Sequence, residues 1–286
     1  MASLRILRRR IRSTQNTKQI MRAMQLVSGS KLKRAQARLH EARAVLEFLD
    51  GLLQRIVETP PGVDHPLTVQ CERAESALVV FTSDTGLCGA YNTNLIQLAE
   101  AYLQRDSLRQ TQLIYIGKKG HRYFTKRGYP AADAYLDLAG RPNLQTAEAI
   151  GRALMERFVS GRVSSVKLLY AQFVSSMVFR PTIRSWLPIT FSRQHTADST
   201  QQEYIFEPSR QRVVEELLPR WALATFQLVL LEAFTSEHSA RMVAMKNATD
   251  NAEEIIKELT LQRNKIRQAA ITKELSEIIG TAEALT

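Results

Sequence analysis

Proline is absent from two long stretches of this 286-residue chain, and its absence limits the fold more than any motif does. Residues 2–58 contain no proline, and residues 220–279 contain neither proline nor glycine. Because a proline inside a helix removes a hydrogen bond and clashes with the preceding turn, such stretches permit unbroken helices. A helix of about 55 residues is roughly 80 Å long, more than the diameter of a compact domain of this mass. We therefore expect the paired ends to form a rod.

Cysteine and histidine are too few and too scattered for a metal or redox site. The two cysteines, Cys71 and Cys88, fit no metal or redox spacing, which is typical of a protein from a reducing compartment. The five histidines include no pair four residues apart, and no pair of carboxylates stands out from the solvated helix charges. The sequence thus predicts no metal, no cofactor and no catalytic residue.

Long apolar runs and aromatic residues are scarce as well. No run of 18 apolar residues exists, so we expect no membrane-spanning segment, and the first residues lack the apolar core of a secretory signal. Phe48 is the only aromatic residue among the first 80, which counts against the base stacking used by many nucleic-acid-binding proteins.

The proline-free stretches carry apolar residues on a seven-residue repeat, which makes two helices wind around each other. Because a domain separates them, the two helices must run antiparallel if they pair within one chain. Polar repeat positions such as Lys18 and Gln25 predict a locally looser contact, whereas His238 is typical of a core polar residue that sets register. The repeat selects Leu4, Leu7, Ile11, Thr14, Lys18, Met21, Gln25, Ser28, Leu32, Ala35, Leu39, Ala42, Leu46, Leu49, Leu53 and Ile56, and later Trp221, Ala224, Leu228, Leu231, Thr235, His238, Met242, Met245, Thr249, Ala252, Ile256, Leu259, Arg263, Ile266 and Ala270.

Positive charge is concentrated on the first of these helices. The whole chain has a net charge of +11, and residues 1–55 carry thirteen Lys and Arg against three Asp and Glu, a net charge of +10. Charge runs usually mark a solvated face, but ten net charges exceed what solubility requires. We therefore favour an acidic partner, which could be nucleic acid, anionic lipid or an acidic protein surface.

Between the two stretches the apolar pattern indicates strands that alternate with helices. This alternation predicts a small, mostly parallel, Rossmann-like α/β sheet. Pro219 is expected to kink the last helix or to mark its restart. We divide the chain into a helix at 1–59, a linker at 60–75, an α/β domain at 76–191, a polar loop at 192–209 and a helix at 210–286. Strands are expected at 76–83, 111–116, 132–138, 165–174 and 182–189, and helices at 94–105, near 117–128 and at 145–160.

The segment 83–89, Ser-Asp-Thr-Gly-Leu-Cys-Gly, follows a predicted strand and precedes a helix, the position at which α/β proteins hold phosphates. It lacks the Gly-Lys-Ser/Thr of a P-loop and the three-glycine spacing of a dinucleotide site. We favour a structural turn that exposes polar atoms to a partner, and a nucleotide site remains the alternative. Cys88 is expected to be a small buried residue rather than a nucleophile.

Three segments of the chain resemble the γ subunit of F-type ATP synthases. They are residues 11–36 (IRSTQNTKQIMRAMQLVSGSKLKRAQ), 83–95 (SDTGLCGAYNTNL) and 240–285, which begins ARMVAMKNATDN. The resemblance implies a non-catalytic rotor shaft formed by the two terminal helices inside a ring of three α and three β subunits. It also implies an α/β domain at the foot that binds the ε subunit and the ring of c subunits.

The same resemblance implies roles for individual residues. Met24, Lys18, Arg22 and Arg9 are expected on the shaft facing the β subunits. Arg267, Gln268, Thr272 and Lys273 are expected to form the contact that catches a β subunit. Ile278, Ile279 and Leu285 would turn in an apolar sleeve of the hexamer, and Asp84, Thr85 and Tyr91 would lie toward ε and the c-ring.

The chain departs from the usual family pattern at Gly29, where alanine is common, at Ala90, where glycine is common, and at Lys273, where glutamine is common. The cysteine-bearing insertion of the chloroplast type is missing, so thiol regulation is not expected. The implied location is the cytoplasmic face of a bacterial plasma membrane, peripheral to it. Two other hypotheses remain open: a basic coiled-coil protein that binds nucleic acid, and an α/β enzyme that uses the loop at 84–89.

Overall fold

The computed structural model describes residues 2–58, 65–69, 75–105, 111–138, 143–190, 206–207 and 209–283. The chain comprises two compact units. Residues 1–29 and 241–286 form one, called here the two-helix unit, and residues 30–240 form the other, called the sheet unit. Helix α1 (Ala2–Glu58) and helix α5 (Arg210–Glu283) each contribute to both units. Much of the predicted linker and polar loop lies outside the described residues, and the five-part division stays a prediction about domains.

The sheet unit is built on a five-stranded sheet in the order β3-β2-β1-β4-β5. Its strands are β1 (Glu75–Phe81), β2 (Thr111–Ile116), β3 (Ala131–Tyr135), β4 (Val163–Phe173) and β5 (Phe179–Leu187). The first four pair in parallel, and β5 returns antiparallel to β4 as a hairpin. The prediction of a mostly parallel sheet is therefore confirmed, and the order of the first four strands is that of a Rossmann-like half.

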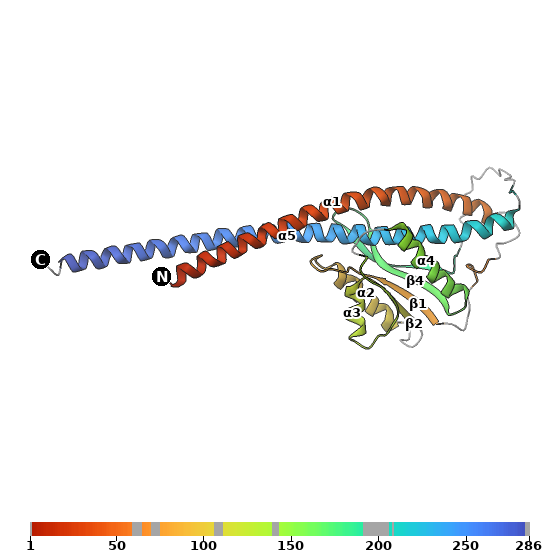
Figure 1. Ribbon diagram of the computed structural model, residues 1–286, viewed down its shortest axis with the longest axis horizontal. Helices are drawn as coiled ribbons and strands as arrows, with labels where there is room; N and C mark the ends of the chain where they lie inside the picture. The colour runs from red at the N-terminus through yellow and green to blue at the C-terminus, as the bar shows by residue number, and fades with distance from the viewer. Residues whose placement is uncertain are drawn as a thin grey trace. The chain divides into compact units, whose positions relative to one another are not determined.

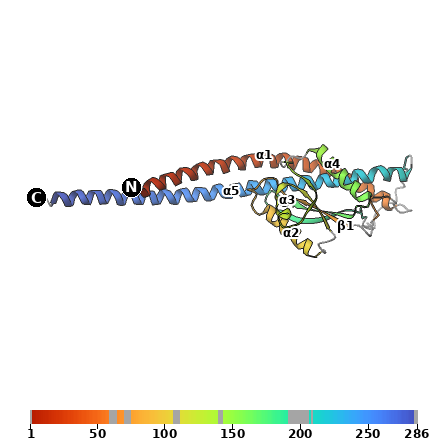
Figure 2. The ribbon, with the colours of Figure 1, turned by 60° about the horizontal axis from the view of Figure 1, so that its bottom comes forward.

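Helices cover both faces of this sheet, which explains why the central strands are continuously apolar. Helices α2 (Tyr91–Arg105) and α3 (Lys118–Thr125) pack on one face. Helix α4 (Leu144–Val159) and the sheet-unit part of α5 pack on the other, as Figures 1 and 2 show. Buried aromatic rings such as Phe81, Trp186 and Phe226 fill the second interface.

Pro219 lies inside α5, which continues without interruption from Arg210 to Glu283. Of the two outcomes expected at Pro219, the restart does not occur, and the kink stays a prediction. Val214, Leu218 and Ala222, on either side of it, are buried in the core. Their burial offsets the roughly 3 kcal/mol that a proline costs inside a helix.

The two long helices run antiparallel within each unit, and the predicted seam is their contact. Every α1 position selected by the seven-residue repeat is buried or half-buried, from Leu4 to Ile56. The α5 positions are likewise buried or half-buried from Trp221 to Ala270, with Ile266 just exposed at 36%. The predicted antiparallel pairing is confirmed.

One segment of α5 is apolar enough, by length and composition, to cross a membrane, and it lies within Arg210–Ile279. Of that apolar window, 61% is buried inside the protein. Core helices pass the same test, and the packing of α5 on the sheet accounts for its apolar character.

Candidate partner interface

The first half of α1 presents an unbalanced positive surface in the two-helix unit. Six arginines are exposed there: Arg5, Arg8, Arg9, Arg10, Arg12 and Arg22. Residues 1–29 contain no acidic residue, so α1 itself offers these charges no partner. Of the residues predicted to face the β subunits, Arg9 and Arg22 are thus exposed, and Met24 is half-buried beside the seam.

Lys18 behaves differently from the arginines because it bonds across the seam. Its ammonium donates to Glu253 Oε2 at 3.0 Å, and its side chain is only 26% exposed. This hydrogen bond is the largest of the causes that lower the pKa of Glu253. An ion pair thus joins the helices at this polar seam position, and the predicted looser contact there stays a prediction. Its predicted role toward the β subunits stays a prediction.

The register of the two helices shows where α1 stops accompanying α5. A methyl group added at Gly29 would meet Met242 Sδ at 3.5 Å, and Lys18 meets Glu253. In an antiparallel pair of helices, the numbers of opposing residues add to a nearly constant sum, and both pairs here give 271. The start of α1, at residue 2, therefore lies opposite about residue 269 of α5. Figures 1 and 2 agree, because the blue end of α5 continues past the red start of α1. Every described residue from Ile271 to Ile279 is exposed.

This unaccompanied end of α5 carries apolar side chains on one stripe. Ile271, Leu275 and Ile278 follow at intervals of four and three residues, and Ile279 lies beside them. All are between 49% and 64% exposed. An exposed apolar stripe of this kind is typical of a surface that a partner covers. Leu285, also predicted to enter the sleeve, lies outside the described residues.

The four predicted catch residues lie at the boundary between the accompanied and unaccompanied parts of α5. Arg267 and Gln268 are exposed, and their side chains form no hydrogen bond or ion pair with other described residues. The Thr272 hydroxyl donates to the Gln268 carbonyl at 3.0 Å, and Lys273 forms a loose pair with Glu277 at 3.7 Å. Their side chains therefore remain accessible, and their role as a catch stays a prediction.

The loop after β1 uses its polar atoms to join neighbouring loops. Asp84 Oδ1 accepts the backbone N–H of Lys118, after β2, and that of Asp137, after β3, both at 3.2 Å. The Ser83 hydroxyl donates to the Thr85 carbonyl at 2.6 Å, and the Asn92 amide donates to Ser83 Oγ at 2.7 Å. These bonds favour the structural turn over a phosphate site. Thr85 is exposed, and its predicted contact with ε or the c-ring stays a prediction.

Tyr91 was predicted to face a partner, and that prediction is wrong. Its side chain is 1% exposed, and its hydroxyl donates to the Ala233 carbonyl of α5 at 3.0 Å. Its ring also packs beside Phe179, with centroids 5.7 Å apart. Tyr91 therefore ties the start of α2 to α5. Cys88 is buried next to it, as expected for a small core residue.

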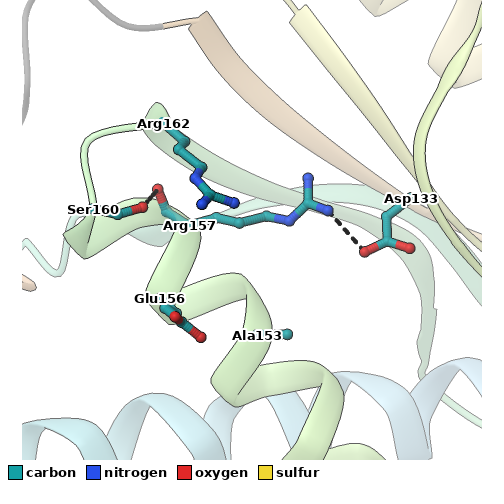
Figure 3. Close-up of a pocket in the computed structure, with 6 residues that line it drawn as sticks. All are labelled: Asp133, Ala153, Glu156, Arg157, Ser160 and Arg162. Carbon is teal, nitrogen blue, oxygen red and sulfur yellow. Dashed lines mark hydrogen bonds and ion pairs between the residues drawn. The ribbon is translucent and has the colours of Figure 1, made fainter.

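A polar pocket of about 210 Å³ lies between the end of α4 and strand β3 (Figure 3). Arg157 reaches from α4 to Asp133 Oδ2 at 2.9 Å, and the Tyr135 hydroxyl donates to the same oxygen at 3.0 Å. The remaining charged side chains, Glu156 and Arg162, are exposed and opposite in sign. Because its charges balance, the pocket favours neither an anion nor a cation. Across the described ranges, no group of three metal-ligating side chains occurs.

Sequence reasoning missed two features of this interface. Glu253 was not identified as the partner of Lys18, although the antiparallel register would have found it once one contact was known. The apolar stripe at Ile271, Leu275 and Ile278 was recognised only at its last member, although the spacing of four and three residues is visible in the sequence.

Known proteins match this chain over almost its whole length. The family described as ATP synthase matches residues 3–285. The chain is 43% identical to the ATP synthase gamma chain of Symbiobacterium thermophilum, over 97% of this chain and 96% of that one. It is 41% identical, over the full length of both, to the ATP synthase gamma chain of Pelotomaculum thermopropionicum.

Solved structures show the same fold at lower identity. A chain in the Euglena gracilis mitochondrial ATP synthase OSCP/F1/c-ring structure superposes with a TM-score of 0.72 at 21% identity, over 99% of this chain and 95% of that one. A chain in the central stalk and c-ring structure of Tetrahymena thermophila mitochondrial ATP synthase gives 0.60 at 23% identity, over 80% and 99%.

Proposed function

Because the chain belongs to the family of ATP synthase gamma chains, we propose that it is the rotor that couples ion flow to ATP synthesis or hydrolysis. Its partners are a ring of three α and three β subunits, the ε subunit and the c-ring. The chain itself catalyses nothing, and the complex lies on the cytoplasmic face of a bacterial plasma membrane. No comparison supports the alternative of a nucleic-acid-binding coiled coil.

The observation that carries this proposal is the unaccompanied end of α5. The exposed apolar side chains between Ile271 and Ile279 favour burial against a partner. Their burial requires no hydrogen bond or ion pair of fixed direction. A smooth apolar sleeve formed by a ring of subunits satisfies both conditions. Apolar burial is non-directional, so the helix can turn in such a sleeve without breaking specific bonds.

The physical basis of coupling is a mismatch of symmetry. One asymmetric pair of helices inside a threefold ring cannot contact three identical β subunits identically. Each orientation therefore favours a different conformation, and a different nucleotide affinity, at each β site. A ligand or partner shifts such an equilibrium only by its differential contact energy, which the uneven faces of the shaft supply.

The exposed arginines of α1 suit a partner that moves past them. Charges attract over roughly 8–10 Å at physiological ionic strength, so attraction to an acidic β-subunit loop survives small displacements. Interlocked apolar side chains would resist the same displacement. We infer that Arg9 and Arg22 belong to this sliding contact, with Met24 beside them.

The catch residues are tested by substitution in the assembled complex. Gln268→Ala removes an exposed side-chain amide that forms no hydrogen bond with other described residues, so the free chain should keep its stability. Ion-driven ATP synthesis should fall about tenfold, which equals the loss of about 1.4 kcal/mol, or one to two hydrogen bonds to β. The matched control is Gln262→Ala, an exposed glutamine earlier on the same helix. Equal rates in the two variants would exclude Gln268 from the catch.

The proposal as a whole is tested by reconstitution. The chain, co-expressed with α and β subunits, should purify in a complex containing three α, three β and one copy of this chain, and the complex should rotate with ATP. The purified chain alone should show no ATPase activity. Failure to associate with α and β, or ATP hydrolysis by the chain alone, contradicts the proposal.

A further inference from the structure

Glu232 is an acidic residue in the most apolar part of α5. It lies within the run Leu228-Val-Leu-Leu-Glu-Ala-Phe234, and its side chain is only 5% exposed. Removing a carboxylate from water is costly unless charged and hydrogen-bonding partners replace the water. An apolar residue of similar size would pack on the sheet without that cost. The position of Glu232 therefore calls for an explanation beyond packing.

The partners of Glu232 come from the other long helix and from the sheet. Arg43 of α1 donates from Nη2 to Glu232 Oε1 at 2.6 Å, and from the same nitrogen to the Phe173 carbonyl at the end of β4 at 3.1 Å. Tyr170 of β4 lies close enough to Glu232 for the carboxylate to act on the pKa of its hydroxyl. Burial, and secondly the charge of Glu232, raises the pKa of Tyr170 to about 12, so its hydroxyl stays protonated. Through Arg43, the pair thus joins α1, α5 and the end of β4.

Further polar contacts continue along the same stripe of α5. Ser236 and Ser239 follow Glu232 by four and seven residues and therefore lie on the same face of the helix. The Ser236 hydroxyl donates to the Ala171 carbonyl at 2.9 Å, and the Ser239 hydroxyl donates to the Ser176 carbonyl in the hairpin turn. Gln36 of α1 donates to Ser176 Oγ at 3.2 Å. The hairpin is therefore hydrogen-bonded to both long helices.

These contacts differ from the apolar packing around them in how they respond to displacement. Apolar side chains can exchange neighbours when a helix turns or slides by a fraction of a turn, because burial has no preferred direction. A buried carboxylate cannot move in this way, because even a small shift leaves it unpaired in a medium of low dielectric constant. The charged contact thus opposes rotation of the helices on the sheet.

We propose that the Arg43–Glu232 pair, held on the Phe173 carbonyl, is a torsion lock that keeps α1 and α5 from turning on the sheet. This inference rests on the proposed rotor function, in which torque enters one part of the chain and is used at another. Arg43 and Glu232 are positioning residues: they contact no nucleotide and act by fixing the angle between the sheet and the shaft helices.

The lock is tested by the angular stiffness of the rotating complex. The α and β ring is fixed to a surface, and a bead is attached through Gln104→Cys, an exposed position on α2, in a chain with Cys71→Ser. The test variant is Arg43→Met with Glu232→Gln, which approximately keeps side-chain volume and removes both charges of the pair. The variance of the bead angle at each dwell should rise roughly twofold, because a directional contact is replaced by a non-directional one.

A matched control removes an ion pair elsewhere on the same sheet. Arg157→Met with Asp133→Asn breaks the α4–β3 pair, which involves neither long helix, and should leave the variance unchanged. The single variant Arg43→Lys keeps the charge but loses the fork of the guanidinium, and its variance should fall between those of the unaltered chain and the double variant.

The outcomes separate the lock from the proposed function. If the unaltered chain does not rotate in the ring, the rotor function itself fails. If the unaltered chain rotates, and the variance of the bead angle in the Arg43→Met/Glu232→Gln variant is no larger than in the control variant, the lock is overturned. Should the double variant not assemble, Arg43→Lys decides alone: no increase in variance would contradict the lock.

Discussion

Helix α5 meets two different environments along its length. From Ala222 to Ala240 nearly every residue is buried, because the helix packs on the sheet, on α1 and beside α2. In the two-helix unit the covered residues lie on or beside the seam, and every described residue from Ile271 to Ile279 is exposed. The comparison teaches that one unbroken helix can be a core element, half of a coiled coil and an uncovered apolar surface, according to what its faces meet.

The largest difference between these environments should appear on truncating apolar side chains. Phe226 is fully buried, with ring centroids 6.0 Å from Phe81 and 5.3 Å from Trp186. Phe226→Ala should lower the free energy of unfolding by about 3–5 kcal/mol, because it opens a cavity in a close-packed interface. Urea unfolding followed by tryptophan fluorescence measures the change.

The matched change on the uncovered end is Leu275→Ala. Leu275 is 54% exposed, so the stability of the isolated chain should change by less than about 0.5 kcal/mol. A loss of several kcal/mol there would mean that Leu275 packs inside the chain and that the comparison is wrong.

A smaller effect is expected from adding a methyl group where α4 meets α5. An added Cβ at Gly151 would lie 2.8 Å from Leu223 Cδ2 and 3.4 Å from Phe226 Cδ1. Gly151→Ala should therefore destabilise the protein by about 1–3 kcal/mol, although alanine is the better helix former. Thermal unfolding of the full chain would show a lower midpoint, and a raised midpoint would contradict the close packing of α4 on α5.

The same substitution should have the opposite sign on α1. Nothing lies within 4 Å of a Cβ added at Gly51, and at Gly29 the nearest atom is Met242 Sδ at an ordinary contact distance of 3.5 Å. Gly29→Ala and Gly51→Ala should each stabilise the chain by about 0.5–1 kcal/mol through helix propensity. A destabilised Gly29→Ala variant would show that the helices of the two-helix unit approach more closely than these distances.

The smallest effect concerns the Lys18–Glu253 pair. The hydrogen bond from Lys18 lowers the pKa of Glu253 in the folded chain below its ordinary value of 4.5. As pH falls through this range, the unfolded state therefore binds a proton before the folded state does. The stabilisation is complete above pH 4.5 and is lost as pH falls through the folded pKa. Glu253→Gln should thus differ slightly from the unaltered chain at pH 7 and not at about pH 2. If Glu253→Gln and the unaltered chain had the same melting curve at pH 7 as well as at about pH 2, a contribution from the pair would be excluded.

Much of the fold was predictable because local patterns carried it. The seven-residue repeat predicted the seam positions, including Leu39 and Met245, and β-branched apolar runs predicted strands such as Thr111–Ile116. These features depend on the chemical character of neighbouring residues, which the sequence contains. The candidate interface was only partly predictable. The exposed arginines and Ile278 and Ile279 were found, whereas Tyr91 was placed outside although it is buried.

What the sequence did not show has one physical cause, which is that contacts between distant segments position each side chain. Only the folded chain places Glu253 opposite Lys18. It also shows that the Asp84 carboxylate, expected toward ε and the c-ring, joins the loops after three strands. Pro219 was expected to kink the helix or to mark its restart, and the helix does not restart because core packing on both sides offsets the cost of the proline.

Residue patterns along the chain were enough to predict the two long helices, their basic and apolar faces, the alternation of strands and helices between them, and the family. The register of α1 on α5, the point at which α5 continues alone, and the contacts of Arg43 with Glu232 and the end of β4 became visible only in the folded chain. The reason is that helix and strand patterns arise from residues a few positions apart. Register and ion pairs depend on residues about 190 to 235 positions apart, which only the folded chain brings together.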